Sequence, residues 1–352
     1  MAVFSKVRFK RHLAVLGTAL FAVPILAACS SGSSSNTGSS SSSTSTSATV
    51  TWGAGVPTME DAIAFVAMGI GAFQKYNLHV NFVAGPSAPT LLTTGDADII
   101  RTNFSDAALL AKEGQSVKAF GLVATNTPAG LIAGNAVKSI QDLHAMGSNC
   151  IIASPASSDF YEYPHYWSTK FGLKCKIDVV SDFKLALDGV VAGRYTAAPQ
   201  LVSDVGAVVA SKQAHWVIAP GSAPLPFTDI SSVYMTTSAY LNSNKSAVAR
   251  FVRALKYTEN KMHTMSNQQM AQAIKNSGAS LWQAESVAEI VDQLTANGQV
   301  SNVFQLDKLN LGPLSKTVYY QNLDAQPAQN VPITPSNPEF AYSNLVDNSL
   351  IG

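Results

Sequence analysis

The stretch NLHVNFVAGPSAPTLLTTGDADII, residues 77–100, decides the fold class. Its first seven residues alternate between apolar and polar side chains, as one strand of a half-buried sheet does. The Gly- and Pro-containing segment 85–89 then ends the strand, and a short helix through 91–92 is expected to end at Gly95. Residues 97–100 have the composition of a second, buried strand. A strand, a helix and a further strand in this order predict a parallel sheet.

The same alternation extends outward from this stretch. A strand at 50–52, a helix from Thr58 to about Tyr76, a helix at 105–112 and a strand at 117–124 complete a βαβαβ pattern. A comparable series of helices and strands fills residues 139–220, and about 300 folded residues exceed the size at which one core usually keeps growing. We therefore predict an α/β protein with two doubly wound lobes.

The remaining elements are expected to return to the first lobe. A strand at 232–237 leads back toward it, and amphipathic helices follow at 245–265, 267–276 and 281–296. The tail from Pro327 onward is rich in Pro and Asn and is expected to lie along the surface.

The chain begins with a pattern typical of a lipoprotein signal peptide. Four basic residues precede an apolar run, 13–26, that is too short to span a membrane as a helix. Small residues then lead to Cys29, whose thiol would carry a diacylglycerol. We expect residues 1–28 to be removed, and the Ser-rich segment 29–48 to form a flexible tether from the membrane surface.

Charge and motifs narrow the function. Four of the 23 basic residues lie in the signal peptide, so 19 remain against 22 acidic residues, which disfavours nucleic-acid binding. A G-x-S-x-G nucleophile elbow is missing from the sequence, and the histidines and cysteines lack metal-ligand spacing. The sequence thus predicts no catalytic residue, metal site or cofactor.

Two cysteines remain after Cys29. Cys150 and Cys175 each open a strand-like run, and strands joined by one helix are commonly neighbours in a parallel sheet. In an exported chain a disulfide between them is plausible, and two buried free thiols are the alternative.

Five segments of the chain match the motifs of a known family in order. They are GIGAFQKYNLHV (69–80), TGDADI (94–99), SIQDLH (139–144), VAGRYTAA (191–198) and ARFVRA (249–254). Together they resemble the type II periplasmic binding proteins of the nitrate, sulfonate and thiamine-precursor group. The chain departs from the family pattern at Thr196, where Asp is usual, at Asn77, where Gly is usual, and at Met146-Gly147, where a Gly-Lys turn is usual.

The resemblance implies two lobes that close by hinge motion on a ligand held in the cleft between them. It places crossing strands near 131–137 and 232–237, so that residues 49–135 with 233–352 form lobe 1 and residues 136–232 form lobe 2. It also implies a receptor that delivers a small molecule to an ABC permease and its ATPase. With the lipid predicted on Cys29, we expect this receptor to lie at the outer face of the cell membrane, and we expect it to be a monomer.

Independently of the family, open parallel sheets bind ligands beyond the carboxyl ends of their strands. This rule selects residues in the loops after the predicted strands. The candidates are Pro57, Thr58, Ser87, Arg101, Asn103, Ser105, Ser157, Ser158, Asp159, Tyr161, Gln200 and Ser203. Ordinary helix capping is the alternative role for their hydroxyl groups.

The candidates point to two ligand classes. Tyr161 with Asp159 or Glu162 suits a flat nitrogen heterocycle, such as a vitamin precursor, because the phenol can stack and a carboxylate can accept from an amino group. Arg101 suits an anion such as sulfonate, nitrate or a carboxylate, although a salt bridge within the lobe is equally open to it. The neighbouring rings Phe160, Tyr163, Tyr166 and Trp167 are expected mainly in the core. An exported enzyme or a sensory surface protein on the same fold remains an alternative.

Overall fold

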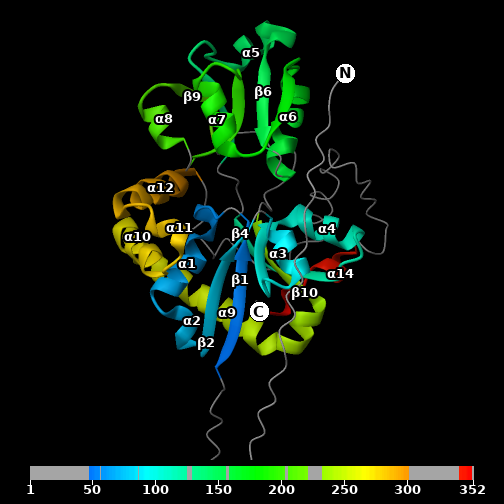
Figure 1. Ribbon diagram of the computed structural model, residues 1–352, viewed down its shortest axis with the longest axis vertical. Helices are drawn as coiled ribbons and strands as arrows, with labels where there is room; N and C mark the ends of the chain where they lie inside the picture. The colour runs from blue at the N-terminus through cyan, green and yellow to red at the C-terminus, as the bar shows by residue number, and fades with distance from the viewer. Residues whose placement is uncertain are drawn as a thin grey trace, which may run out of the picture. The chain divides into compact units, whose positions relative to one another are not determined.

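The computed structural model describes residues 47–55, 57–85, 87–124, 129–155, 158–202, 205–220, 232–300 and 341–350. Cys29, Ser157, Ser203 and most of the tail after residue 300 lie outside these ranges. Two five-stranded sheets, each flanked by helices, form the framework, so the predicted α/β class with two lobes is confirmed (Figure 1).

The first sheet is built mainly from the N-terminal part of the chain. Its strands are β1 (Ala48–Ala54), β2 (Leu78–Ala84), β3 (Ile99–Asn103), β4 (Val117–Ala124) and β10 (Ser232–Thr237). They lie in the order β2-β1-β3-β10-β4. β1, β2 and β3 are parallel, whereas β10 is antiparallel to both β3 and β4.

The second sheet has the same plan. Its strands are β5 (Ala129–Gly134), β6 (Ile151–Pro155), β7 (Lys176–Val180), β8 (Ala197–Leu201) and β9 (Ala214–Ile218). They lie in the order β7-β6-β8-β5-β9, with β5 antiparallel to β8 and β9. In each sheet, therefore, the antiparallel strand, β10 or β5, is fourth in the order. It lies next to the third parallel strand, β3 or β8.

Helices cover the sheets. Those of the first lobe are η1 (Met59–Asp61), α1 (Ala62–Gly69), α2 (Ala72–Lys75), α3 (Ala88–Thr94), α4 (Phe104–Lys112), α9 (Ser238–Met262), α10 (Asn267–Asn276), α11 (Ser280–Gln283), α12 (Val287–Val300), α14 (Tyr342–Leu345) and η6 (Asn348–Leu350). Those of the second lobe are α5 (Ile140–Met146), η2 (Gly147–Asn149), α6 (Ser158–Phe171), α7 (Phe183–Val191) and α8 (Gly206–Ala210). Around the first sheet, α1, α2 and α10 lie on one side, and α3, α4 and α14 lie on the other (Figure 1).

Equivalent hydrogen bonds before β3 and before β8 show which residues of the two sheets correspond to each other. Ahead of β3, the Asp98 backbone N–H donates to Thr51 O at 2.8 Å, and the Thr51 N–H donates to Asp98 Oδ2 at 2.7 Å. Ahead of β8, the Thr196 N–H donates to Ile151 O at 2.8 Å, and the Ile151 N–H donates to Thr196 Oγ1 at 3.0 Å. Thr196 thus fills the role that an aspartate fills in the first lobe, which explains how this departure from the family motif is tolerated.

The predicted boundary between the lobes is displaced. Residues 129–135 were expected in lobe 1, but β5 pairs along its length with β8 and β9, so the described part of the second sheet begins at Ala129. Because β5 is short and wholly apolar, its sequence does not reveal which sheet it joins. The return strand β10 lies in the first sheet as predicted.

Two predicted helices are interrupted. The helix expected from Thr58 to Tyr76 ends at Gly69 and resumes as α2 after Gly71, whose φ of 70° favours glycine. A Cβ on Gly69 would lie 1.8 Å from Ala273 O, so glycine is needed where α1 contacts α10. The helix expected at 281–296 splits into α11 and α12, and the Ser286 hydroxyl accepts from the Glu289 N–H at the new start.

Aromatic residues form much of both cores. In the first lobe Trp52 contacts Phe65 and Phe82 with ring centroids 5.1 and 4.8 Å apart. In the second lobe Tyr163 and Trp167 are fully buried and stack at 5.5 Å, which confirms their expected place in the core.

A disulfide joins Cys150 to Cys175, as predicted, with a Cα–Cα distance of 4.6 Å. It lies where β6 and β7 begin, at the opposite end of these strands from their carboxyl termini. No helix among the described residues is long and apolar enough to cross a membrane.

The last described residues cover the edge of the first sheet. Val346 forms a parallel bridge with Ala119 of β4, and the Asp347 N–H donates to Ala119 O at 3.0 Å. Lys118 Nζ also donates to Ser343 O at 2.7 Å. An edge strand presents unpaired backbone groups, and this segment occupies part of that edge.

Candidate functional site

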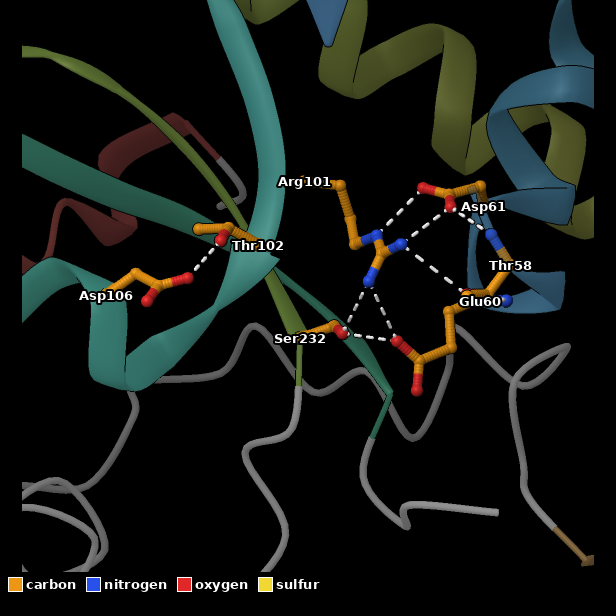
Figure 2. Close-up of polar contacts among 7 residues, drawn as sticks. All are labelled: Thr58, Glu60, Asp61, Arg101, Thr102, Asp106 and Ser232. Carbon is orange, nitrogen blue, oxygen red and sulfur yellow. Dashed lines mark hydrogen bonds and ion pairs between the residues drawn. The ribbon is translucent and has the colours of Figure 1, made fainter. Parts of the chain in front are cut away.

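A buried cluster of charges lies at the carboxyl ends of the parallel strands in the first sheet. Arg101 on β3 pairs in register with Ala54, the last residue of β1, and with Tyr234 on β10. Asp61 and Glu60 belong to η1, which follows β1, and Ser232 begins the antiparallel strand β10. All four side chains meet at one edge of the sheet, the edge where open α/β sheets bind ligands (Figure 2).

The Arg101 guanidinium is held by contacts on all three of its nitrogens. Nε donates to Asp61 Oδ1 at 2.8 Å and Nη2 donates to Asp61 Oδ2 at 2.7 Å, a bidentate pair. Nη1 donates to Glu60 Oε2 at 3.1 Å and to Ser232 Oγ at 3.3 Å. Nη2 also donates to Thr58 Oγ1 at 3.4 Å. The number of contacts equals the five N–H donors of a guanidinium.

Local sequence places the two carboxylates. Thr58 caps η1, because its Oγ1 accepts from the Glu60 N–H at 3.3 Å and Asp61 Oδ2 accepts from the Thr58 N–H at 2.8 Å. This capping box fixes Asp61 beside Arg101. Ser232 donates to Glu60 Oε2, the oxygen that also accepts from Arg101, so Glu60 is fixed from two strands.

The cluster is buried and carries excess negative charge. Glu60 is 7% exposed, Asp61 is fully buried and Arg101 is 8% exposed, so two carboxylates surround one guanidinium. Burial alone would lower the pKa of Arg101, but the Asp61 and Glu60 carboxylates raise it above its usual value. Arg101 therefore stays charged at every physiological pH.

Tyr234 lies beside the cluster without joining it. Its hydroxyl is buried and has no hydrogen-bond partner among the described residues. Burial, followed by the charge of Asp61, raises the pKa of the phenol above its ordinary value. The phenol is therefore neutral and adds no charge to the site.

A third carboxylate, Asp106, lies in the first turn of α4 near the same edge. It accepts a hydrogen bond from the Thr102 hydroxyl (Figure 2). Burial raises its pKa to about 6, although the hydrogen bonds from Thr102 and Asn103 oppose that shift. Asp106 thus titrates between acidic and neutral pH.

The structure brings together only some of the predicted first-lobe candidates. Arg101 and Thr58 are in contact, and Pro57 is the residue before Thr58 in the chain. Ser87 caps α3, since its Oγ accepts from the Thr90 N–H at 3.5 Å. Asn103 ends β3 and precedes α4. The Ser105 side chain lies outside the described part of the structure.

In the second lobe the candidates occupy the ends of β6 and β8. Gln200 is fully buried in β8, and its Nε2 donates to Phe183 O at 2.9 Å. Ser158, Asp159 and Tyr161 belong to the first turns of α6, but their side chains are outside the described set. Their role in binding stays a prediction.

Sequence reasoning missed three members of the cluster. Glu60, Asp61 and Ser232 were not among the candidates, although Glu60 and Asp61 follow Thr58 as a recognisable helix-start signal. Nothing in the sequence indicated Ser232, because it reaches the site only through the pairing of β10 with β3. Among the described residues, no group of three or more His, Cys, Asp or Glu side chains could hold a metal ion.

Comparison with known proteins gives one family and many similar folds. The model of a family described as "NMT1/THI5 like" matches residues 59–265, more than half of the chain. No curated protein matches at a significant level.

Three solved structures illustrate the similarity of fold. The periplasmic nitrate-binding protein NrtA from Synechocystis PCC 6803 superposes with a TM-score of 0.62 at 12% identity, over 87% of each chain. The ligand-binding component of an ABC-type import system from Staphylococcus aureus gives 0.60 at 13% identity, over 86% of this chain and 97% of that one. The alkanesulfonate-binding protein SsuA from Xanthomonas axonopodis pv. citri, bound to MOPS, gives 0.55 at 14% identity, over 79% and 95%.

Proposed function

The chain belongs to the NMT1/THI5-like family, and from this premise we propose that it is the extracytoplasmic solute-binding receptor of an ABC importer. The observation that carries the proposal is the shared topology of the two sheets. Each sheet receives one antiparallel strand just after the chain has left the other sheet, so two strands, β5 and β10, follow the crossings between lobes. Structures with the same fold include components of ABC import systems.

The proposed receptor binds its ligand unchanged and has no catalytic step. It acts as a monomer outside the cell membrane, tethered through a lipid on Cys29, and delivers the ligand to a permease and its ATPase. The sequence pattern before Cys29 supports the anchor. A lipid label such as radioactive palmitate should enter the wild-type protein and be lost in Cys29→Ser.

A nitrogen heterocycle is the favoured ligand, and a small anion is the alternative. The case for an anion rests on Arg101 and on the ligands named for similar folds, nitrate and alkanesulfonate. The contacts of Arg101 with Asp61 and Glu60 weaken that case, because the guanidinium already faces two carboxylates. The case for a heterocycle rests on the aromatic start of α6 and on acceptor groups at the strand ends.

Thermal unfolding of the mature protein in the presence of small molecules tests the proposal. A ligand at a hundredfold excess over Kd stabilises the native state by about 2.7 kcal/mol, which raises Tm by several degrees. The panel should contain pyrimidines, flavins and other nitrogen heterocycles against nitrate, sulfonates and carboxylates. We expect a heterocycle to stabilise the protein and to be recovered unchanged. Conversion of any panel member, or no stabilisation by any of them, would contradict a receptor function.

A further inference from the structure

The charge cluster at the end of the first sheet is poorly suited to an anion. Arg101 would be the cationic group for such a ligand, but its five donors are matched by five contacts within the protein. An incoming nitrate or sulfonate would have to displace Asp61 or Glu60 from the guanidinium. It would also approach two carboxylates that exceed Arg101 in charge, which is unfavourable in a partly desolvated site.

Glu60, by contrast, retains an acceptor. Its Oε2 accepts from Arg101 and Ser232, whereas Oε1 makes no hydrogen bond to any described residue. Figure 2 shows this second oxygen pointing away from Arg101. The Glu60 side chain as a whole is only 9% exposed, and Oε1 keeps lone pairs that no described residue uses. Such a group favours a charged N–H donor, because charge-assisted hydrogen bonds are the strong ones.

The topology does not require charged residues on these two strands. In the second sheet the corresponding strand β8 reads Ala-Ala-Pro-Gln-Leu, and the inserted strand β5 reads Ala-Gly-Leu-Ile-Ala-Gly. Neither strand carries a charged residue, yet the two sheets share one topology. Since a buried ion pair adds little stability over apolar residues of similar size, the cluster is better explained by recognition than by folding.

We propose that Glu60 binds a positively charged nitrogen of the ligand through Oε1, with Arg101, Ser232 and the Thr58 cap holding the carboxylate in place. The ligand class is then an organic cation, such as an amidinium or a protonated aminoheterocycle. This rests on the proposed receptor function and deepens it. The negative charge of Asp61 and of Asp106 near the same edge favours a cation further.

Isosteric probes test the charge of the ligand directly. Benzamidine, benzamide and benzoate share one shape but carry a positive, a zero and a negative charge, and nitrate and methanesulfonate cover small anions. Each is titrated into the mature protein by calorimetry and by Tm. We expect benzamidine to bind and benzoate, nitrate and methanesulfonate to leave Tm unchanged.

Variants then connect the effect to Glu60. Glu60→Gln keeps the volume and an acceptor for Arg101 but removes the charge, so benzamidine should bind about 10- to 100-fold more weakly. Ser232→Ala removes one donor to Oε2 and should weaken binding a few-fold. Glu113→Gln alters an exposed carboxylate at the end of α4 and serves as the matched control, with unchanged affinity.

The outcomes separate this inference from the proposed function. Binding of an anion or of a neutral heterocycle that is insensitive to Glu60→Gln would overturn the cation site and leave the receptor intact. Benzamidine binding that Glu60→Gln does not weaken would also overturn it. Failure of benzamidine to bind overturns it too, and failure of all probes and heterocycles would count against both.

Discussion

The two sheets share one plan but differ in what lies at the carboxyl ends of their strands. Asp98 bonds to Thr51 as Thr196 bonds to Ile151, so the residues that follow can be matched one to one. By that count, Arg101 of the first sheet corresponds to Pro199 of the second.

The antiparallel strands β10 and β5 also differ in whether they bring a polar side chain to this end of the sheet. Ser232 pairs with Asn103 in the first sheet, and Ala129 pairs with Leu201 in the second, so a hydroxyl that contacts Glu60 has a methyl group as its counterpart. The two sheets therefore have equivalent strand ends, and among the described side chains the buried charges at those ends belong to the first lobe. The second lobe has its covalent link, the disulfide, at the opposite end of its strands.

The largest effect is expected from breaking the cluster on one side only. Arg101→Met leaves Glu60 and Asp61 buried without a counter-ion and should lower the free energy of unfolding by about 3–5 kcal/mol. Urea denaturation measures this loss. Lys184→Met, which removes the exposed pair with Asp188 in the second lobe, should leave stability unchanged.

A loss below about 1 kcal/mol in Arg101→Met would show that the carboxylates are not truly desolvated. The triple variant Glu60→Met, Asp61→Asn and Arg101→Met removes all three charges at once. It should regain most of the stability that Arg101→Met loses, because no uncompensated charge remains. The first sheet would then resemble the second.

The second lobe should lose stability through its disulfide. Cys150→Ser with Cys175→Ser opens a loop of 25 residues and should lower the free energy of unfolding by about 3 kcal/mol. A reductant should lower wild-type stability to the same degree and should not affect the double variant. Equal stability of the wild-type protein with and without reductant would contradict the prediction.

Lowering the pH should raise the free energy of unfolding through Asp106 in the first lobe and lower it through Asp182 in the second. Burial raises the pKa of Asp106 in the folded protein to about 6 from the ordinary 3.8, so the folded state binds this proton more tightly than the unfolded state does. The free energy of unfolding should fall on the order of 1–2 kcal/mol as pH rises from about 4 to about 6. Asp106→Asn should remove this slope in denaturation curves recorded across the range.

The control lies in the second lobe. The Ser181 hydroxyl and the Leu185 N–H lower the pKa of Asp182. Its contribution is therefore present above the ordinary carboxyl pKa and is lost as pH falls below it. Asp182→Asn should thus reduce stability at neutral pH and leave the slope between 4 and 6 in place. An unchanged slope in Asp106→Asn would refute the assignment.

The smallest effect is expected from the hydrogen bond between Ile151 and Thr196, by which the two sheets were matched. Thr196→Val removes the acceptor for the Ile151 N–H and should lower the free energy of unfolding by about 1 kcal/mol. Thr196→Asp, which copies Asp98, should preserve stability. Both are measured by urea denaturation, and an equal loss in the two variants would mean that the hydrogen bond is not the cause.

Periodicity in the sequence predicted most strands and helices, since a half-buried strand and an amphipathic helix each leave a local pattern. It could not place the lobe boundary, because the apolar run of β5 fits either sheet and only pairing with β8 and β9 decides. The interruption at Gly69 was also missed, since it depends on the distant Ala273.

For the candidate site, the sequence predicted the edge of the sheet at which Arg101 lies, but not the residues that contact it. The strand-end rule located Arg101 and Thr58 correctly at the edge of the sheet. It could not show that residues 60, 101 and 232 would meet, because that contact requires β10 to pair with β3. At Asn77 the structure instead explains a departure that was visible in the sequence. Its φ of 54° shows why the family prefers glycine there, and Asn is a residue that tolerates this conformation.

The position of β10 also determines the order in which the two sheets can be completed during synthesis. β4 has β10 as its strand neighbour, and β10 follows the whole second sheet in the chain. Because the N-terminus is made first, the second sheet has all five of its strands once Ile218 has been made. The first sheet still lacks β10 at that point. The lobe that carries the charge cluster is therefore the last to close, and a nascent chain halted before Ser232 would leave the facing edges of β3 and β4 unpaired.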